Sequence, residues 1–255
     1  MKLPQADLLN VPNAENLFVA GGRLPNEKFF KAVAQGRKIF CIDKGVEICR
    51  ACNILPQVLI GDFDSAENSA VNWAIENKIP VKNYPVEKDF TDTQLALNLF
   101  AKNIPAIVTG IFGGRFDHLF SNVFTCANYK NIFLADEREI IFYINGGDFV
   151  EVNFFQMPLA ISLLPITETC EGVTTKNLHW ELTDAALKQN LPNAVSNRAE
   201  SSQIKISVRR GTLAIYFCFN ESISFLISLN FSEATAAGLF DISSITRCNF
   251  EIFWL

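Results

Sequence analysis

The stretch KIFCIDKGVEICRACNILPQVLIGDFDS, residues 38–65, decides the fold of the first half of the chain. It holds two short apolar runs, KIFCI (38–42) and QVLIG (57–61), which predict buried strands. The segment EICRACN (47–53) between them is typical of a helix. Aspartates follow both apolar runs directly. Because near-continuous apolar strands that alternate with helices are covered on both faces, the stretch indicates a parallel sheet.

The same alternation continues on both sides of this stretch until about residue 140. The further strand candidates are NLFVA (16–20), AIVTG (106–110) and NIFLA (131–135). The helix candidates, with apolar residues three and four apart, are NEKFFKAVAQG (26–36), AENSAVNWAIENK (66–78) and TDTQLALNLFAKN (91–103). The pattern predicts a three-layer α/β/α fold with a mostly parallel, Rossmann-like sheet. In such sheets ligands bind at the carboxyl ends of the strands.

The pattern changes after about Ile140, where β-rich segments replace the alternation. These segments are EIIFYI (139–144), DFVEVNFF (148–155), LAISLLP (159–165), QIKISV (203–208) and TLAIYFCF (212–219). Turn signals such as Asn145-Gly146-Gly147 separate them, which predicts an antiparallel β-sandwich. We expect the polar stretch 181–201 to be a long loop, and the tail 220–255 shows no clear pattern.

Length and charge exclude several classes of protein. The 255 residues correspond to about 1.7 domains at roughly 150 residues each. A hydrophobic fraction of 49% with 19% charged residues argues against disorder and for a packed core. The net charge of −5, from 22 basic and 27 acidic residues, argues against a nucleic-acid partner bound through its phosphates.

Leader and cysteine patterns predict a cytoplasmic protein. Polar residues and prolines break every apolar run in residues 1–16, so we expect no secretory leader, and no run is long enough for a membrane span. The seven cysteines are odd in number and mostly lie in apolar segments, which is typical of reduced thiols. Cys49 and Cys52 form a C-x-x-C pair without a second ligand pair for zinc, and we interpret it as structural.

Polar clusters follow the predicted strands or precede the next helix. They are Asp43, GDFDS (61–65), KDFTD (88–92) and GGRFDH (113–118). Because the carboxyl ends of parallel strands share one edge of a sheet, we expect these clusters to lie side by side. Carboxylates gathered in this way repel each other by roughly 1–4 kcal/mol per pair near a surface. A cation such as Mg²⁺, which prefers oxygen ligands and phosphates, would offset that repulsion.

Two aspartate pairs have a spacing that suits such an ion. Asp62 and Asp64 can converge on one metal from a loop, and Asp89 and Asp92 can both face a cleft around a helix start. Any one of these residues is more often a turn or cap residue, and Asp92 before TQLAL could simply cap its helix. Their recurrence at neighbouring strand ends favours function.

The GGRFDH motif adds groups that bind anions. Gly113 and Gly114 would let backbone N–H groups approach a phosphate, and Arg115 could hold its oxygens with two hydrogen bonds. Taken singly, the glycines form an ordinary turn, Arg115 and Asp117 an ordinary surface pair, and His118 a structural side chain. Together with the carboxylates, the motif predicts a nucleotide-phosphate site.

The three motifs also carry a family resemblance. GDFDS, KDFTD and GGRFDH, in this order and spacing, resemble the thiamine pyrophosphokinase family. In the second half SLLP (162–165), Leu178-His179-Trp180-Glu181-Leu182 and Ser196-Asn197 are similar to that family's second-domain signals. The resemblance covers about residues 16–218.

The resemblance implies a fold, an activity and an assembly. The fold is an α/β nucleotide-binding catalytic domain (16–140) followed by a thiamine-binding β-sandwich (141–219), with the tail 220–255 unassigned. The activity is ATP-dependent diphosphotransfer, in which the pyrophosphoryl group of ATP moves to thiamine and AMP is released. The assembly is a homodimer whose active sites lie between subunits.

The resemblance also implies roles for particular residues. The metal ligands are Asp62, Asp64, Asp89 and Asp92, with Mg²⁺ as the ion. The nucleotide-binding residues are Asp43, Lys88, Asp89, Thr91, Gly113, Gly114, Arg115, Asp117 and His118. Thiamine is bound by Gln94, Trp180, Ser196 and Asn197, with Trp180 and Ser196 contributed across the dimer. Asp64 or Asp92 accepts the hydroxyl proton, and a wide aromatic face such as Trp180 suits a flat, partly cationic ligand.

The sequence departs from the family pattern at two positions and leaves other functions open. Lys44 follows Asp43 where the family often has Asp-Gly-Gly, and Asn177 stands where a glycine is common. One alternative is a pyrophosphokinase for another alcohol, such as a pterin. A second is a haloacid-dehalogenase-like phosphatase in which Asp62 is the nucleophile and Asp64 the acid/base. A third is a non-catalytic sensor that binds nucleotide or thiamine.

Overall fold

The computed structural model describes residues 14–102, 104–154, 156–220, 226–233 and 248–253. The chain divides into two compact units. The N-terminal unit ends at Glu137 and the C-terminal unit begins at Arg138. Each unit is described by itself below.

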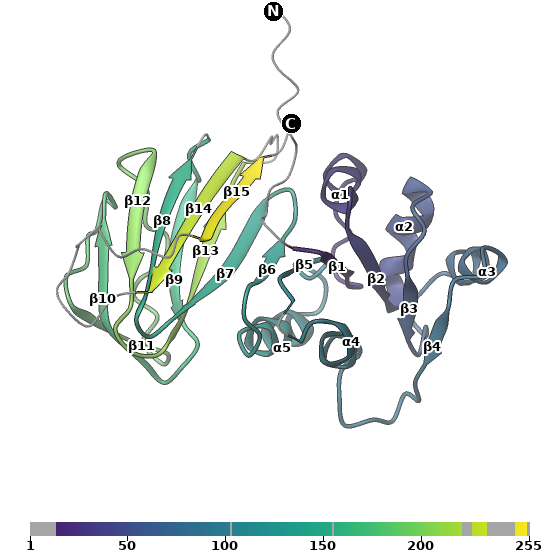
Figure 1. The fold of residues 1–255 in the computed structure, drawn as a ribbon. Coiled ribbons are helices and arrows are strands. Elements are labelled where there is room, and N and C mark those ends of the chain that lie inside the picture. Colours follow the sequence, from purple (N-terminus) through teal and green to yellow (C-terminus); the bar gives the residue numbers. More distant parts are fainter. Residues whose placement is uncertain (1–13, 103, 155, 221–225, 234–247, 254–255) are drawn as a thin grey trace, which may run out of the picture. The chain divides into compact units, whose positions relative to one another are not determined.

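The N-terminal unit is built on a parallel sheet of six strands (Figure 1). In sheet order the strands are β4 (Val81–Asn83), β3 (Val58–Gly61), β2 (Lys38–Ile42), β1 (Asn16–Val19), β5 (Ala106–Thr109) and β6 (Ile132–Ala135). Neighbours in this order pair in parallel. Every residue of β1, β3, β5 and β6 is buried, which explains why these strands are apolar throughout.

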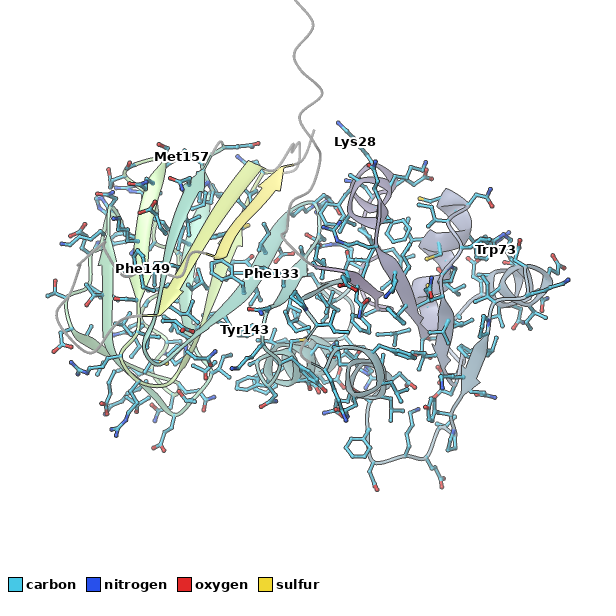
Figure 2. All side chains as sticks on the ribbon, viewed as in Figure 1. Lys28, Trp73, Phe133, Tyr143, Phe149 and Met157 are labelled. Carbon is cyan, nitrogen blue, oxygen red and sulfur yellow. The ribbon has the colours of Figure 1, made fainter. Side chains whose placement is uncertain are left out.

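Five helices cover the two faces of this sheet (Figure 1). They are α1 (Glu27–Ala34), α2 (Val46–Cys52), α3 (Asn68–Glu76), α4 (Asp92–Phe100) and α5 (Phe116–Cys126), together with the short 3₁₀ turn η1 (Asp43–Gly45). Helices α1 to α3 contact one another in series, and α4 contacts α5. On α1, Phe29 and Phe30 are buried while Lys28 projects away from the sheet (Figure 2). This amphipathic spacing is the signal that predicted the helix.

The prediction of a mostly parallel α/β fold is confirmed for this unit. The five apolar runs are β1, β2, β3, β5 and β6, and the segment EICRACN is helical in α2. Strand β4 was missed, because it has three residues, all exposed at the sheet edge, and therefore no apolar run. The strand order changes direction between β1 and β5, which places a switch point at the carboxyl ends of these two strands.

The C-terminal unit consists of antiparallel strands in two groups (Figure 1). One group, in order, is β7 (Glu139–Asn145), β13 (Thr212–Cys218) and β9 (Ala160–Pro165). The other is β11 (Ala185–Lys188), β10 (Thr169–Lys176), β12 (Gln203–Ser207), β8 (Asp148–Phe154), β14 (Leu226–Glu233) and β15 (Cys248–Phe253). The Phe217 ring of β13 lies edge-on to Phe154 of β8, with centroids 5.2 Å apart, so the two groups share a core. The predicted β-sandwich is confirmed.

Four strands of this unit were not predicted. Strand β10 has the sequence TCEGVTTK, without an apolar run, and β11 has only the four residues AALK, of which Leu187 alone is buried. Strand β11 lies within the stretch 181–201, which is otherwise irregular as expected. The tail 220–255 contributes β14, which pairs with β8, and β15, which pairs with β14. The tail's other residues, 221–225, 234–247 and 254–255, lie outside the described residues.

Two further predictions concern thiols and membrane segments. Of the seven cysteines, the six whose side chains the structure describes, at positions 41, 49, 52, 126, 170 and 218, are free thiols, as predicted. No helix among the described residues is long and apolar enough to cross a membrane. The prediction that residues 1–16 hold no leader falls largely on residues 1–13, which lie outside the described part of the chain.

Candidate functional site

The turn after β2 presents Asp43 at the carboxyl edge of the sheet. Asp43 has a positive φ of 45°, and it opens the turn η1 that leads into α2. A Cβ at Gly45 would overlap the Val19 carbonyl oxygen, so this position requires glycine. Lys44 replaces the first glycine of the family's Asp-Gly-Gly pattern, but the glycine that the turn requires, Gly45, is retained.

The end of β3 lies directly against the Asp43 side chain. Gly61 has a φ of 143°, and a Cβ there would stand 2.6 Å from Asp43 Cγ and overlap Oδ1. The Phe63 backbone N–H donates to Asp43 Oδ1 at 3.4 Å. Asp64 N donates to Asp62 Oδ1 at 3.3 Å, while the Asp64 side chain is exposed. Gly61 is thus a spacer that lets Asp43 and the GDFDS loop lie side by side.

Lys88 links two of the predicted metal ligands. Its Nζ lies 3.3 Å from Asp62 Oδ2 and 3.1 Å from Asp92 Oδ2, and it donates to the Pro85 carbonyl oxygen at 3.1 Å. The three charged side chains are only 13–14% exposed. The second oxygen of Asp92, Oδ1, is buried without a hydrogen-bond partner among the described residues. Of the four predicted metal ligands, only Asp62 and Asp92 thus lie together here, and a lysine lies between them.

The electrostatics of this cluster follow from its burial. Burial raises the pKa of Asp43 to about 7, and the negative charges of Asp92 and Asp62 add to that effect. Burial also disfavours the charged form of Asp62, but hydrogen bonds from the Asp64 backbone and Lys88 outweigh it and lower the pKa. The two carboxylates raise the pKa of Lys88 against the effect of its own burial. Lys88 therefore compensates part of the cluster's negative charge.

The start of α4 shows that Thr91, and not Asp92, caps the helix. Thr91 Oγ1 accepts from Gln94 N at 3.2 Å, and Gln94 Oε1 accepts from Thr91 N at 2.9 Å, which forms a capping box. The Gln94 Nε2 group donates to Thr125 Oγ1 at 3.3 Å. Both ends of the Gln94 amide are thus engaged within the unit. Asp89 is exposed in the loop before the helix and does not join the Lys88 cluster.

The loop between β5 and α5 carries the GGRFDH motif. Gly113 and Gly114 have φ values of 67° and 68°, which glycine adopts without strain. Arg115 is the N-cap residue of α5, and its Nε and Nη2 atoms lie 3.1 and 2.6 Å from the two oxygens of Asp117. Both side chains are exposed, at 74% and 62%. The Arg115 guanidinium is therefore exposed to solvent, but its Nε and Nη2 atoms are engaged by Asp117. His118 is exposed in the first turn of the helix.

The Gly21-Gly22-Arg23 segment after β1 was missed by the sequence reasoning. A Cβ at Gly22 would stand 2.8 Å from the Gly110 carbonyl oxygen and 3.0 Å from that of Phe112. Gly22 N donates to Gly110 O at 2.7 Å, so this loop lies tightly against the β5–α5 loop at the switch point. A Gly-Gly pair directly after an apolar run was the available signal.

In the C-terminal unit, Asn197 holds Trp180. The buried Asn197 side chain accepts from Trp180 N at 3.1 Å and donates to Trp180 O at 2.9 Å. The Trp180 side chain itself is exposed, and Ser196, the residue before Asn197, is exposed with a φ of 57°. Trp180 and Ser196 are available to a ligand, whereas the Asn197 amide is committed to positioning Trp180.

Charged residues surround Trp180. His179 lies edge-on to the indole, Arg198 stands 5.9 Å from the ring centroid, and Glu200 Oε1 lies 2.6 Å from His179 Nδ1.

The backbone conformation of Asn177 explains why asparagine can replace glycine at the second departure from the family pattern. Its φ is 64°, a left-handed conformation that suits glycine and that asparagine tolerates better than most residues.

The donor chemistry of the Lys88 cluster fits Mg²⁺. Asp62 and Asp92 supply carboxylate oxygens, of which Asp92 Oδ1 has no hydrogen-bond partner among the described residues and the Oδ2 atoms contact Lys88. No three acidic, histidine or cysteine side chains among the described residues form a ready-made metal cage. Mg²⁺ is usually held by one or two carboxylates plus substrate phosphates, so a two-carboxylate site is sufficient.

The fold and this polar edge together define the class: a doubly wound α/β protein with loops suited to phosphate, joined to an antiparallel β-sandwich. Two family models match the chain. The catalytic domain of thiamin pyrophosphokinase matches residues 30–135, and the vitamin B1 binding domain matches residues 156–213. The chain belongs to the thiamine pyrophosphokinase family, as the motifs predicted.

Individual relatives agree with this assignment. Thiamine pyrophosphokinase of Bacillus subtilis (strain 168) is 28% identical over 180 residues, which cover 68% of this chain and 83% of that protein. Thiamine pyrophosphokinase 1 of Oryza sativa subsp. japonica is 23% identical over 166 residues, which cover 60% and 62%.

Solved structures share the fold. Thiamine pyrophosphokinase from Bacillus subtilis superposes with a TM-score of 0.71 at 24% identity, covering 81% of this chain and 99% of that one. The yeast enzyme superposes with a TM-score of 0.68 at 17% identity, covering 83% and 88%. Both therefore share the fold of this chain.

Proposed function

We propose that the chain is a thiamine pyrophosphokinase, which transfers the pyrophosphoryl group of ATP to thiamine and releases AMP. The N-terminal unit, close to the predicted range 16–140, binds the nucleotide. The sandwich, predicted over 141–219, binds thiamine. The observation that carries the proposal is the gathering of Asp43, Asp62 and Asp92 with Lys88 at the same sheet edge as the GGRFDH loop.

The nucleotide half of the reaction uses the loops at this edge. Asp62 and Asp92 would hold Mg²⁺, with Asp64 and Asp89 as further ligands from adjacent loops. Bound there, Mg²⁺ neutralises charge on the triphosphate and favours departure of AMP. Arg115 would bind phosphate oxygens with its exposed guanidinium, in exchange for its hydrogen bonds to Asp117. Lys88, Asp43 and the Gly113-Gly114 turn complete the contacts with the nucleotide, together with Thr91, Asp117 and His118.

The transfer itself exchanges one P–O bond for another. The hydroxyethyl oxygen of thiamine bonds to the β-phosphorus, and the bond between that phosphorus and the α,β-bridging oxygen breaks, so AMP leaves with the bridging oxygen. The hydroxyl proton passes to a carboxylate, Asp64 or Asp92. Asp92 Oδ1 has no hydrogen-bond partner in the described part of the chain, which leaves it able to accept a proton. The protein supplies position and charge rather than covalent chemistry.

The proposed binding site for thiamine, the acceptor of the pyrophosphoryl group, is the exposed surface around Trp180. The exposed indole offers a flat face to a cationic heteroaromatic ligand, and the exposed Ser196, which precedes Asn197 in the chain, offers a hydroxyl. Gln94 contributes if thiamine displaces its bond to Thr125. We propose a homodimer in which Trp180 and Ser196 serve the nucleotide unit of the second copy. The free thiols support a reducing compartment, the cytoplasm.

The test is direct. Purified protein is incubated with ATP, Mg²⁺ and thiamine, and the products are separated by chromatography. We expect thiamine diphosphate and AMP in equal amounts. Inorganic phosphate without AMP would instead indicate the phosphatase alternative, and ATP binding without turnover the sensor. A pterin alcohol offered in place of thiamine tests the acceptor class. Replacing Asp64 or Asp92 by asparagine then identifies the base from the larger loss of kcat.

A further inference from the structure

Lys88 occupies the centre of the carboxylate cluster. Its ammonium lies within 3.3 Å of one oxygen of Asp62 and of one oxygen of Asp92, and all three side chains are about 86% shielded from water. Asp43 adds a third carboxyl group that interacts electrostatically with all of them. The two ion-paired carboxylates therefore outnumber the single ammonium, and Asp43 adds a further negative charge when it is ionised.

This arrangement makes the lysine and a metal ion competitors. A divalent cation at Asp62 and Asp92 would share its ligand oxygens with a positive charge about 3 Å away from each of them. Like charges at such separations repel strongly where water is largely excluded. A metal ion can therefore bind Asp62 and Asp92 with its full affinity only after the Lys88 ammonium has moved away from their oxygens.

Lys88 has the means to leave. It lies in the loop between β4 and α4 and not within either element. Its charge is carried on a flexible four-carbon stem, and besides the two carboxylates it donates a hydrogen bond to the Pro85 carbonyl oxygen of the same loop. The triphosphate of an incoming nucleotide offers it a more concentrated negative charge than the two carboxylates.

We propose that Lys88 is a built-in counter-ion, which occupies the carboxylate cluster of the nucleotide-free enzyme and moves to the phosphates when Mg²⁺ and ATP arrive together. This inference rests on the proposed function, because it takes the cluster to be the site of metal and triphosphate. It adds an order of binding to that function. Free Mg²⁺ binds the nucleotide-free enzyme poorly, and binds well only together with the nucleotide.

The experiment compares three variants of the full-length protein stripped of metal with a chelator. Lys88→Met removes the charge, Lys88→Arg keeps it, and Lys82→Met removes a charge from the exposed strand β4 nearby as the matched control. Mn²⁺ alone, as the probe, is titrated calorimetrically into each protein, and thermal unfolding is followed with and without Mg²⁺. No nucleotide is present in either measurement.

We expect Lys88→Met to bind Mn²⁺ about tenfold more tightly than the wild type or more. Its metal-free form should melt lower than Lys82→Met, and Mg²⁺ should restore most of the loss. Lys88→Arg should resemble the wild type in both respects. Equal Mn²⁺ affinity in Lys88→Met and the wild type, or an unfolding temperature equal to that of Lys82→Met, would overturn the proposal.

Two further arms keep the outcome unambiguous. If Lys88→Met does not fold without metal, combining it with Asp92→Asn should restore folding when charge repulsion is the cause. No restoration would mean that Lys88 serves packing, and the proposal fails. The product assay on the wild type is independent of these measurements. Failure to form AMP there would overturn the proposed function, whatever the metal titrations show.

Discussion

Replacing Gly61 by alanine tests how the sheet edge positions Asp43. Gly61 has a φ of 143°, where an L-residue is strained by on the order of 1–3 kcal/mol. The new Cβ would also overlap Asp43 Oδ1, so the carboxylate must move. Its hydrogen bond from Phe63 N would be lost, which adds about 1–2 kcal/mol. We expect a total destabilisation of about 2–5 kcal/mol.

Gly36→Ala provides the matched control. Gly36 also has a positive φ, of 74°, but a Cβ there meets no atom of the described residues within 4 Å. This variant therefore carries backbone strain of about 1–2 kcal/mol without crowding. The difference between the two variants isolates the contact with Asp43. At roughly 3–4 °C per kcal/mol, Gly61→Ala should melt several degrees below Gly36→Ala.

Two assays follow both consequences. Thermal unfolding by circular dichroism gives the stability difference, and AMP formation at saturating thiamine gives the KM for ATP. We expect Gly61→Ala to raise that KM about tenfold and Gly36→Ala to leave it near the wild-type value. If the two variants coincide in both unfolding temperature and KM, Asp43 does not depend on Gly61 for its position and the reasoning is refuted.

Three further predictions follow from the site. Trp180→Ala should raise the KM for thiamine about 5- to 30-fold through loss of stacking, with the KM for ATP unchanged; equal thiamine KM values in steady-state kinetics would contradict the role of the indole. Asn197→Ala should destabilise the protein by about 2–3 kcal/mol in urea unfolding because its buried hydrogen bonds to Trp180 are lost, and Asn197→Asp, which keeps the acceptor oxygen, should cost less. In metal-free buffer the pKa of Asp43 is about 7 in the folded protein and 3.8 in the unfolded chain. Between these values the folded state holds a proton that the unfolded state has lost, so the free energy of unfolding falls as the pH rises from about 4 to 7. Asp43→Asn should flatten that slope in unfolding temperatures measured between pH 4 and 8, and an unchanged slope would show that another group causes it.

Much of the N-terminal unit could be predicted from the sequence. Its strands are buried on both faces, so they appear as continuous apolar runs, and each run ends at the edge where the polar motifs lie. The short strand β4 gave no such signal, because it is exposed at the end of the sheet. Parallel topology then placed Asp43, GDFDS and GGRFDH on one edge without any knowledge of contacts.

Particular contacts in the site could not be predicted. That Thr91 caps α4 was visible in the spacing Thr91-x-x-Gln94, but Asp92 is an equally good cap residue by type. The bridging position of Lys88 depends on a loop path that no periodicity encodes. Burial of the Asn197 amide depends on the pairing of Ile161 with Asn197, which are distant in sequence. Residue type and spacing indicate chemistry, whereas the orientation of each side chain depends on long-range pairing.

Strands β14 and β15 of the tail cover an edge of the β-sandwich that β8 would otherwise form. Strand β14 pairs along β8 from Ile227 opposite Phe154 to Glu233 opposite Asp148, so the β8 backbone has partners on both sides. A chain shortened to end at residue 219 would retain every proposed ligand-binding residue and yet expose the unpaired N–H and C=O groups of β8. Such an open edge is a template for strand addition by other chains. Residues 220–255 therefore bear on solubility and self-association, and a shortened chain would reveal this as concentration-dependent aggregation rather than as altered kinetics.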